Sequence, residues 1–295
     1  AVLRRLFDPI VARIAVDHGL IRSGQVRPYD DAALLAQFRP AMYQLPQPGS
    51  LMVSDQSGYQ FLIMKYDDLV LTSPLVAPVR ASLPAPTRDR LQFVTRDVRP
   101  AEWGDDSRWT VWAPDGRNAL HTWHQRLPDY DPRSRPWFVR ALANYRDRTD
   151  DAVRANPREA VAWTDPYVLF TSKTPGLSAS LAARDPEGRL VIVAYDLLLD
   201  DLMRFTAGHR PTPRGQVFVL DDRERMVGLP GAPSLATAEA RAAAMLATTE
   251  DAGVPEMAEA FRVWHAAGKP EGTTVRFEQA GDGWWTSFRP FELGS

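Results

Sequence analysis

The chain has 295 residues, of which 44% are hydrophobic and 24% are charged, a composition typical of folded globular proteins and not of disordered ones. Its 35 basic and 37 acidic residues leave a net charge of -2 and form no basic stripe, which argues against nucleic acid as a partner. Cysteine is absent, which excludes disulfides, thiolate nucleophiles and cysteine-based zinc sites.

The sequence contains no stretch of about 18 or more apolar residues, the length needed for a membrane-spanning helix. The first twenty residues alternate charged and hydrophobic side chains and lack the ordered regions of a signal peptide. The chain begins at Ala1 and not at a methionine, and we expect further segments to flank it. Its length allows one to three domains, and two is the expectation.

Two helices are predicted at the start of the chain. Over residues 2–21, hydrophobic side chains recur at spacings of three and four, which is typical of an amphipathic helix. The stripe consists of Leu3, Leu6, Phe7, Ile10, Val11, Ile14 and Leu20. A second helix over 30–43 begins with two aspartates that suit a helix N-terminus, and the prolines and glycine of 46–49 end the region.

The middle of the chain predicts an antiparallel sheet. The stretches 50–55 and 59–68 are joined by a tight turn with a glycine, the pattern of a β-hairpin. A helix is expected to open at Pro136, where proline is tolerated in the first turn. Further strand-like stretches lie at 91–98, 108–114, 176–185 and 189–198.

The same order then recurs in shortened form. A helix is expected at 199–208, followed by two short strands, an alanine-rich helix at 234–249 and a final hairpin around the GDG turn. The proline- and glycine-containing segment 209–215 reads as a linker. The predicted division is a helical stalk at 1–45, a first module at 46–208 and a second at 209–295. The fold class is therefore α+β, with a separate antiparallel sheet in each of two PAS-like modules.

Three stretches together resemble a known family: YDPRSRPWFVRAL (130–142), WTDPYV (163–168) and EGRLVIVAYDLLLDDL (187–202). In this order and spacing they are similar to double Cache (dCache) domains, the extracytoplasmic sensor domains of bacterial chemoreceptors, sensor kinases, cyclases and phosphatases. The resemblance covers nearly the whole chain. It implies a long N-terminal helix and two tandem Cache modules, no enzymatic activity and no cofactor.

The resemblance also implies a location and partners. The protein would be an inner-membrane receptor, and this segment would be periplasmic or extracellular and attached through flanking transmembrane helices. A small-molecule ligand, an amino acid or an organic acid, would bind in the membrane-distal module. A homodimer is a further partner that the resemblance leaves open.

The ligand-binding positions that the family implies carry over residue by residue. Two positions depart from its pattern: Phe138 stands where the family has tyrosine, and Leu169 stands where it has aspartate. The candidate ligand-binding residues are Tyr130, Arg135, Trp137, Phe138, Tyr167 and Asp196.

The chemistry of this set can be stated without the family. Arg135 offers a planar fork of donors that suits a carboxylate, and Asp196 could pair with a ligand ammonium. Trp137, Phe138 and Tyr167 would form apolar walls with one hydroxyl. Because the two departures remove polar groups, a plain carboxylate or a more apolar ligand also fits.

Four of these residues also have a structural interpretation. Trp137 and Phe138 could pack in a core, as aromatic residues commonly do. Arg135 could be a solvated surface charge. Asp196 could cap the N-terminus of the helix that follows it.

Other patterns point to other functions more weakly. His121 and His124 lie in an extended stretch that would direct them to opposite sides, so no metal site is predicted there. The nine tryptophans make a carbohydrate-binding module the alternative function, which would need exposed aromatic rings in a shallow groove. An unfamiliar enzyme is a third hypothesis, but the sequence shows no nucleophile and base pattern and no phosphate-binding loop.

Overall fold

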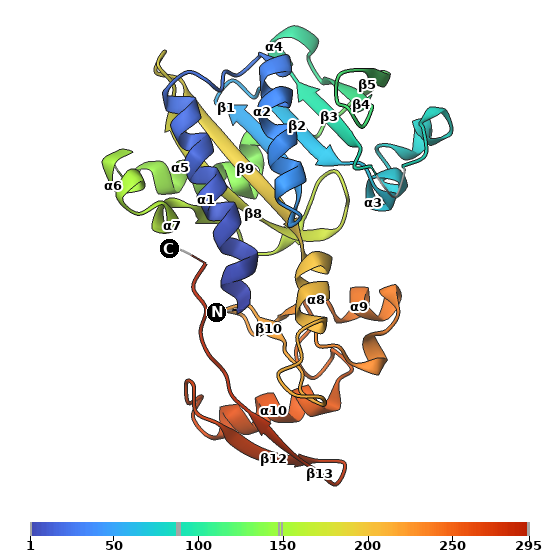
Figure 1. Cartoon of the computed structure of the whole chain (residues 1–295), viewed down its shortest axis with the longest axis vertical. Helices are drawn as coiled ribbons and strands as arrows, with labels where there is room; N and C mark the ends of the chain where they lie inside the picture. Colours follow the sequence, from blue (N-terminus) through green and yellow to red (C-terminus); the bar gives the residue numbers. More distant parts are fainter. Residues whose placement is uncertain (1, 87–89, 147, 149, 294–295) are drawn as a thin grey trace. The chain divides into compact units, whose positions relative to one another are not determined.

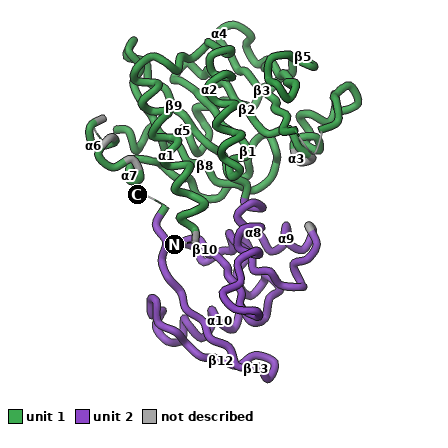
Figure 2. The backbone as a smooth tube through the Cα atoms, in the orientation of Figure 1, with its two compact units in different colours: residues 1–198, 293–295 green, residues 199–292 purple. Residues whose placement is uncertain are grey.

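The computed structural model describes residues 2–86, 90–146, 148 and 150–293. The chain forms two compact units (Figure 2). Each unit has a hydrophobic core of its own. Unit 1 comprises residues 1–198 and 293–295, and unit 2 comprises residues 199–292.

The described part of unit 1 is built on one antiparallel sheet with the strand order β5-β4-β3-β2-β1-β9-β8-β6, while β7 also pairs with β8 (Figure 1). Strands β1 to β5 pair in chain order, and β8 pairs with β9. The pairing of β1 with the late strand β9 joins these two parts of the sheet, and β6 and β7 both pair with β8. The strands are β1 (Pro48–Asp55), β2 (Gln60–Lys65), β3 (Phe93–Val98), β4 (Asp106–Trp112), β5 (Ala119–Arg126), β6 (Ala162–Trp163), β7 (Tyr167–Val168), β8 (Pro175–Arg184) and β9 (Leu190–Leu198).

Helices cover both faces of this sheet. The long helix α1 packs on β8 and β9, α2 packs on β1 and β2, and α5 packs on β8 and β9 from the other side. Asp30 caps α2 by accepting a hydrogen bond from the Ala33 amide at 3.0 Å, as its position predicts. The helices of unit 1 are α1 (Val2–Arg22), α2 (Asp31–Gln44), α3 (Asp68–Thr72), η1 (Ala77–Ser82), α4 (Pro100–Trp103), η2 (Pro132–Ser134), α5 (Pro136–Arg146), α6 (Asp150–Ala155) and α7 (Pro157–Ala160).

The alternation of side chains along the strands assigns each residue to one of the two faces. On β9, Tyr195 points toward α1, where its hydroxyl donates to Asp17 at 2.5 Å. Asp196 therefore points to the opposite face. The two faces explain why every residue of β9 is buried and why its sequence is an almost continuous apolar run.

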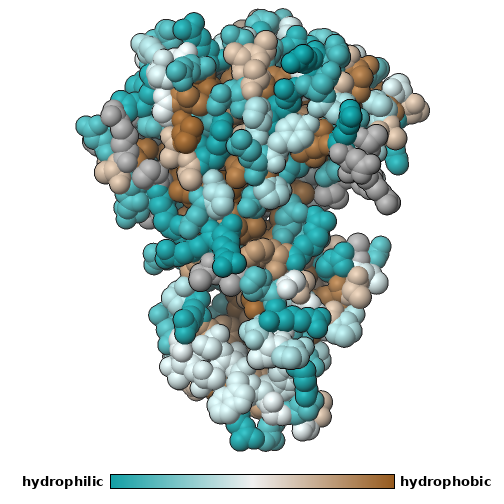
Figure 3. Space-filling view, in the orientation of Figure 1, coloured by the Kyte–Doolittle hydropathy of each residue, from teal (hydrophilic) through white to brown (hydrophobic). Residues whose placement is uncertain are grey.

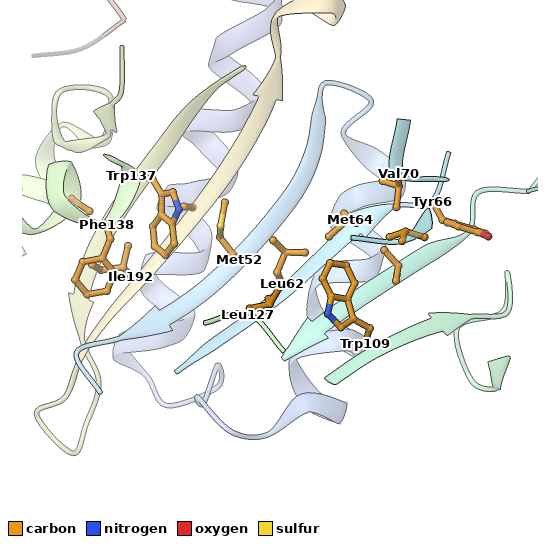
Figure 4. Close-up of a cluster of buried hydrophobic side chains, with 14 of the residues drawn as sticks. Met52, Leu62, Met64, Tyr66, Val70, Trp109, Leu127, Trp137, Phe138 and Ile192 are labelled. Atoms are coloured by element: carbon orange, nitrogen blue, oxygen red, sulfur yellow. The ribbon is translucent and has the colours of Figure 1, made fainter. Parts of the chain in front are cut away.

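The face opposite α1 and α2 carries a hydrophobic core cluster (Figure 4). Met52, Leu62 and Trp109 project from this face of the sheet, where the pairing of strands aligns them in one row. Trp137 and Phe138 of α5 pack onto the same core. Large aromatic side chains dominate the energetics of such a core because each buries about 150–250 Å².

Unit 2 is smaller and contains two two-stranded sheets in its described residues, β10-β11 and β12-β13. Its core gathers Met203, Met226, Leu229 and Met257, among other buried residues. Its elements are α8 (Leu199–Ala207), β10 (Val219–Leu220), β11 (Met226–Gly228), η3 (Pro233–Leu235), α9 (Ala238–Ala244), α10 (Pro255–Ala266), β12 (Val275–Gln279) and β13 (Asp282–Thr286).

The structure has the α+β class that the sequence predicts, but its divisions differ from the predicted ones. The segment 1–45 packs on the sheet of unit 1 and is not a separate stalk. Along the chain, the boundary between the units follows Leu198 and not residue 208. Helix α8 belongs to unit 2 because it packs against β11 and because the Thr206 hydroxyl donates to the Leu229 carbonyl at 2.7 Å.

Two further differences concern unit 2. Its strands form two small sheets where one was expected, so the sheet of unit 1 does not continue into it. The alanine-rich stretch 234–249 forms η3 and the short helix α9, and the longer helix α10 was not predicted. Whether the two units are tandem Cache modules stays a prediction.

The face shown in Figure 3 is mostly hydrophilic, with smaller hydrophobic patches between the polar side chains. Scattered apolar residues of this kind are normal on a protein surface. Across the part of the chain that the structure describes, no helix combines the length and the hydrophobicity needed to cross a bilayer.

Candidate functional site

A pocket lies in unit 1, on the side of the sheet that faces away from α1 and α2. It encloses about 580 Å³ of space free of protein atoms, part of it open to solvent. Strands β1, β2, β3 and β9 supply its floor, and the segments 130–137 and 167–172 supply its walls. Residues from distant parts of the sequence therefore converge on one cavity.

Five of the six candidate residues line this pocket: Tyr130, Arg135, Trp137, Tyr167 and Asp196. The sixth, Phe138, does not line it. Successive residues of a helix point about 100° apart. Trp137 and Phe138 both pack in the core, and Trp137 also lines the cavity whereas Phe138 does not. Phe138 is thus a core residue and not the pocket wall that was expected. Leu169, at the other departure from the family pattern, does line the pocket.

Asp196 is buried on β9 and held by two hydroxyl groups. The Ser50 hydroxyl donates to Oδ2 at 2.8 Å and the Ser178 hydroxyl to Oδ1 at 2.5 Å. Both serines lie directly opposite Asp196, on β1 and β8. Burial raises the pKa of Asp196 to about 6, against the effect of these hydrogen bonds. Because Asp196 lies within β9 and its carboxylate binds the two serines, it does not cap the N-terminus of α8, the structural role that the sequence left open.

Two tyrosines extend this network. The Tyr167 and Ser178 hydroxyl oxygens are 2.7 Å apart, and burial raises the pKa of Tyr167. The Tyr130 hydroxyl donates to Gln60 Oε1 at 2.8 Å, and its ring packs against Phe170 with centroids 4.3 Å apart. Hydrogen bonding thus fixes the orientation of both phenols at the cavity wall.

Arg135 is half-buried at the pocket wall and is not a plain surface charge. Its Nη2 donates to the Val168 carbonyl at 3.3 Å. Its guanidinium carbon lies 5.6 Å from the ring centroid of Tyr167 and 5.7 Å from that of Phe170. Arg135 forms no ion pair with a carboxylate among the described residues, so most of its donors stay available.

Arg96 on β3 is a buried charged residue of the pocket that the sequence reasoning missed. It is only 1% exposed. Its Nη1 donates to the Thr171 hydroxyl at 3.0 Å and its Nη2 to Gln60 Oε1 at 2.7 Å. The ring of Tyr130 lies 4.2 Å from its guanidinium carbon.

The charge of Arg96 is left without an ionic partner. Its Nε is buried and has no hydrogen-bond partner, and the described residues provide no carboxylate for an ion pair. Burial lowers its pKa, as expected for a cation removed from water. The sequence did hold a signal, because Arg96 alternates with Val94 and Val98 and so had to share their buried face.

The other sequence motifs lie away from this pocket. His121 and His124 sit on β5, where they contact different partners, Trp123 and Trp103. Within the described ranges, no group of three histidine, aspartate or glutamate side chains could hold a metal ion.

The tryptophans do not form the exposed groove that a carbohydrate-binding module would need. Trp109 is fully buried, Trp137 is 2% exposed, and Trp103 and Trp112 are half-buried. Trp285 is the exposed one of the nine, all of which the structure describes.

Comparison with known proteins points to bacterial chemoreceptors. No family model matches the chain. The methyl-accepting chemotaxis protein McpC of Bacillus subtilis (strain 168) is 22% identical over 147 residues, which are 49% of this chain and 20% of that protein. The chain therefore spans about a fifth of the length of this curated relative.

Solved structures similar to this one are ligand-binding domains of chemoreceptors. That of PctC of Pseudomonas aeruginosa PAO1, in complex with GABA, is 15% identical with a TM-score of 0.45, over 97% of this chain and 82% of that one. The ligand-binding domain of Tlp3 of Campylobacter jejuni, in complex with 4-methylisoleucine, is 10% identical with a TM-score of 0.46, and the match covers 96% of this chain and 81% of that one. A likeness at these identities and TM-scores assigns neither a role nor a ligand to this chain.

Proposed function

We propose that this chain is the extracytoplasmic sensor segment of a bacterial membrane receptor, and that the pocket of unit 1 binds a small carboxylate or amino-acid-like ligand. Units 1 and 2 are then the two Cache modules of the dCache arrangement, with flanking membrane helices outside this sequence. The protein binds its ligand without transforming it. The three stretches that resemble dCache domains support this assignment.

The observation that carries the proposal is the set of charged groups around the cavity. Arg96 and Arg135 face it without carboxylate partners, and Asp196 faces it from β9. Removing a charge from water costs several kcal/mol unless a partner compensates. A ligand carboxylate would supply that partner, and a guanidinium can bind it through two parallel hydrogen bonds.

The remaining lining suits the hydrocarbon part of a small ligand. Met52, Leu62, Trp137 and Phe170 present apolar surface between the polar groups. Specific pockets commonly combine apolar walls with a few fixed polar groups that orient the ligand. Here Ser50 and Ser178 hold Asp196 in one orientation, so the site is formed before a ligand arrives.

A thermal-shift screen of organic acids, amino acids, amines and sugars on the whole chain tests the proposal. A ligand at 100 times its dissociation constant should raise the free energy of unfolding by about 2.7 kcal/mol. We expect hits among carboxylate-bearing compounds, confirmed by calorimetry with one ligand per chain. Binding of sugars alone would favour the carbohydrate-binding alternative, and the absence of any carboxylate ligand would contradict the proposal.

A further inference from the structure

Two arginines share one wall of the pocket. The guanidinium carbons of Arg96 and Arg135 lie 5.5 and 5.7 Å from the ring centroid of Phe170. The charge of Arg135 also acts on Arg96 and contributes to lowering its pKa, although burial is the larger cause. Like charges repel each other, and a partner of opposite charge that contacts both guanidinium groups would offset this repulsion.

The charges nearby do not neutralise this pair. Lys65 and Asp67 add one charge of each sign to the lining, and the Lys65 ammonium donates to the carbonyls of Leu45 and Pro46. Asp196 is the remaining acid. Its two oxygens already accept hydroxyl groups from serines, and it forms no ion pair with either arginine. The lining therefore holds two guanidinium groups and the ammonium of Lys65 against two carboxylates, those of Asp67 and Asp196.

We propose that the pocket is selective for a short dicarboxylate, with one carboxylate on Arg96 and the other on Arg135. This inference rests on the proposed function and names its ligand class. One carboxylate would pair the buried guanidinium and its free Nε, and the second would pair the half-buried one. The short hydrocarbon between them would lie against Phe170 and Trp137.

The charged and polar groups around Asp196 predict how such binding depends on pH. Those that face it are Ser50, Ser178, Tyr167, Arg135 and Arg96. A dianion favours the protonated form of this acid, whose pKa is about 6 in the free protein. Dicarboxylate affinity should therefore fall as the pH rises above about 6, whereas an ammonium ligand needs the ionised form and should gain affinity.

The test compares succinate, 4-aminobutyrate and butyrate, which share one chain length and differ in the group at one end. Calorimetry on the whole chain should find succinate at least tenfold tighter than the other two, on the order expected for one added charge-assisted contact. Malonate and glutarate extend the series to shorter and longer spacings. The same titrations at about pH 5.5 and about pH 8 test the sign of the pH dependence.

Variants separate the two arginines. Arg96→Gln and Arg135→Gln should each bring succinate to within about threefold of butyrate, because one charge-assisted contact is lost. The control is Arg133→Gln, a surface arginine paired with Asp131 outside the pocket, which should leave the preference unchanged. Arg96→Lys keeps a cation in the core and should keep the order of ligands if Arg96→Gln does not fold.

The outcomes distinguish this inference from the proposed function. If 4-aminobutyrate or butyrate binds more tightly than every dicarboxylate, the dicarboxylate inference is overturned while the sensor proposal stands. If Arg96→Gln lowers the melting temperature but keeps the succinate preference, Arg96 is only a stacking partner of Tyr130 and the inference fails. If no carboxylate binds, both fail.

Discussion

At the residue scale, the site depends on polar groups whose partners are neutral. Gln60, Thr171 and the Val168 carbonyl accept hydrogen bonds from the two pocket arginines and leave the positive charges uncompensated. Elsewhere in the same unit, buried charges are paired. The Asp17 carboxylate, for example, forms an ion pair with Arg13 at 2.8 Å and accepts a hydrogen bond from the Tyr195 hydroxyl. This contrast supports the proposal that the pocket arginines bind a ligand and are not members of structural ion pairs.

Replacing Arg135 with alanine should weaken ligand binding. Arg135→Ala removes a charge-assisted contact worth about 1.5–3 kcal/mol, which corresponds to a tenfold to hundredfold loss in affinity. Calorimetry with a carboxylate identified in the screen measures it. An unchanged dissociation constant would mean that the guanidinium is occupied by Val168 and the aromatic rings and does not touch the ligand.

The substitution Leu169→Asp tests which ligands the departures from the family pattern exclude. Leu169 is 5% exposed and lines the pocket, so an aspartate there adds a carboxylate to the lining. Ligands with an ammonium should gain affinity relative to their deaminated analogues, by about tenfold for one ion-assisted contact. Competition between an amino acid and its deaminated analogue provides the measurement, and an unchanged ratio would refute this account of position 169.

At the scale of elements, β9 connects the pocket to the N-terminal helix. Asp196 faces the pocket on one side of the sheet, and on the other side the hydroxyl of its neighbour Tyr195 donates a hydrogen bond to Asp17 of α1. Strand alternation alone brings this about, because adjacent residues of a strand point to opposite sides. On the same face as Tyr195, Arg108 of β4 links Asp97 of β3 to Asp31 of α2.

Removing the Tyr195 hydroxyl should destabilise the fold. Tyr195→Phe deletes the hydrogen bond to the buried Asp17 carboxylate, and the free energy of unfolding should fall by about 1–3 kcal/mol. Urea unfolding measures this change. The matched control is Tyr145→Phe, since the Tyr145 hydroxyl makes no hydrogen bond to the residues that the structure describes, and an equal loss in both variants would argue against the link.

The carboxyl of Asp97 should make stability depend on pH. Burial, and then repulsion by Asp31, raises its pKa to about 7, well above about 3.9 in an unfolded chain. Because the folded state binds the proton more tightly, this contribution is present below about pH 4 and is lost as the pH rises through about 7.

The variant Asp97→Asn should therefore unfold with a shallower pH dependence. Between about pH 5 and about pH 8, it should lose on the order of 1–3 kcal/mol less stability than the parent protein. Asp196 contributes a slope of the same sign, so the dependence should shrink and not vanish. Urea unfolding at both pH values measures this difference, with Asp105→Asn, a change at an exposed residue, as the control. The same pH dependence of the free energy of unfolding in Asp97→Asn and in the parent protein would contradict the role of Asp97.

At the scale of the whole molecule, the two units each have a hydrophobic core, and the pocket belongs to unit 1. Unit 1 buries its core under a large sheet, whereas unit 2 relies on two short hairpins and its helices. Larger cores bury a greater fraction of their chain and are generally more stable. The units therefore need not unfold together.

Calorimetric unfolding of the whole chain should show two transitions, and a ligand should shift only one of them. The shifted transition should carry the larger enthalpy, because enthalpy scales with the number of residues in the unit. Hydrogen exchange should place the added protection between residues 48 and 198. A ligand that raises both transitions equally, or protects only residues 199–292, would contradict a pocket confined to unit 1.

The sequence by itself determined the features that depend on neighbours along the chain. The period of hydrophobic residues predicted α1, and the two aspartates at the start of α2 with the proline and glycine residues after it predicted α2. The glycine turns predicted the hairpins, and all these signals together indicated an α+β protein. The three short motifs at 130–142, 163–168 and 187–202, through their resemblance to a known family, also pointed to five residues that line the pocket.

Only the tertiary structure decided how distant residues meet. The pairing of β1 with β9 joins Ser50 to Asp196, and the packing of the segment around Thr171 on β3 surrounds Arg96 with neutral acceptors. Likewise, the packing of α5 on the sheet directs Trp137, and not Phe138, to the cavity. Local patterns specify which side of an element is buried, but not which element covers it, and the ionic partner of a buried charge depends on that covering element.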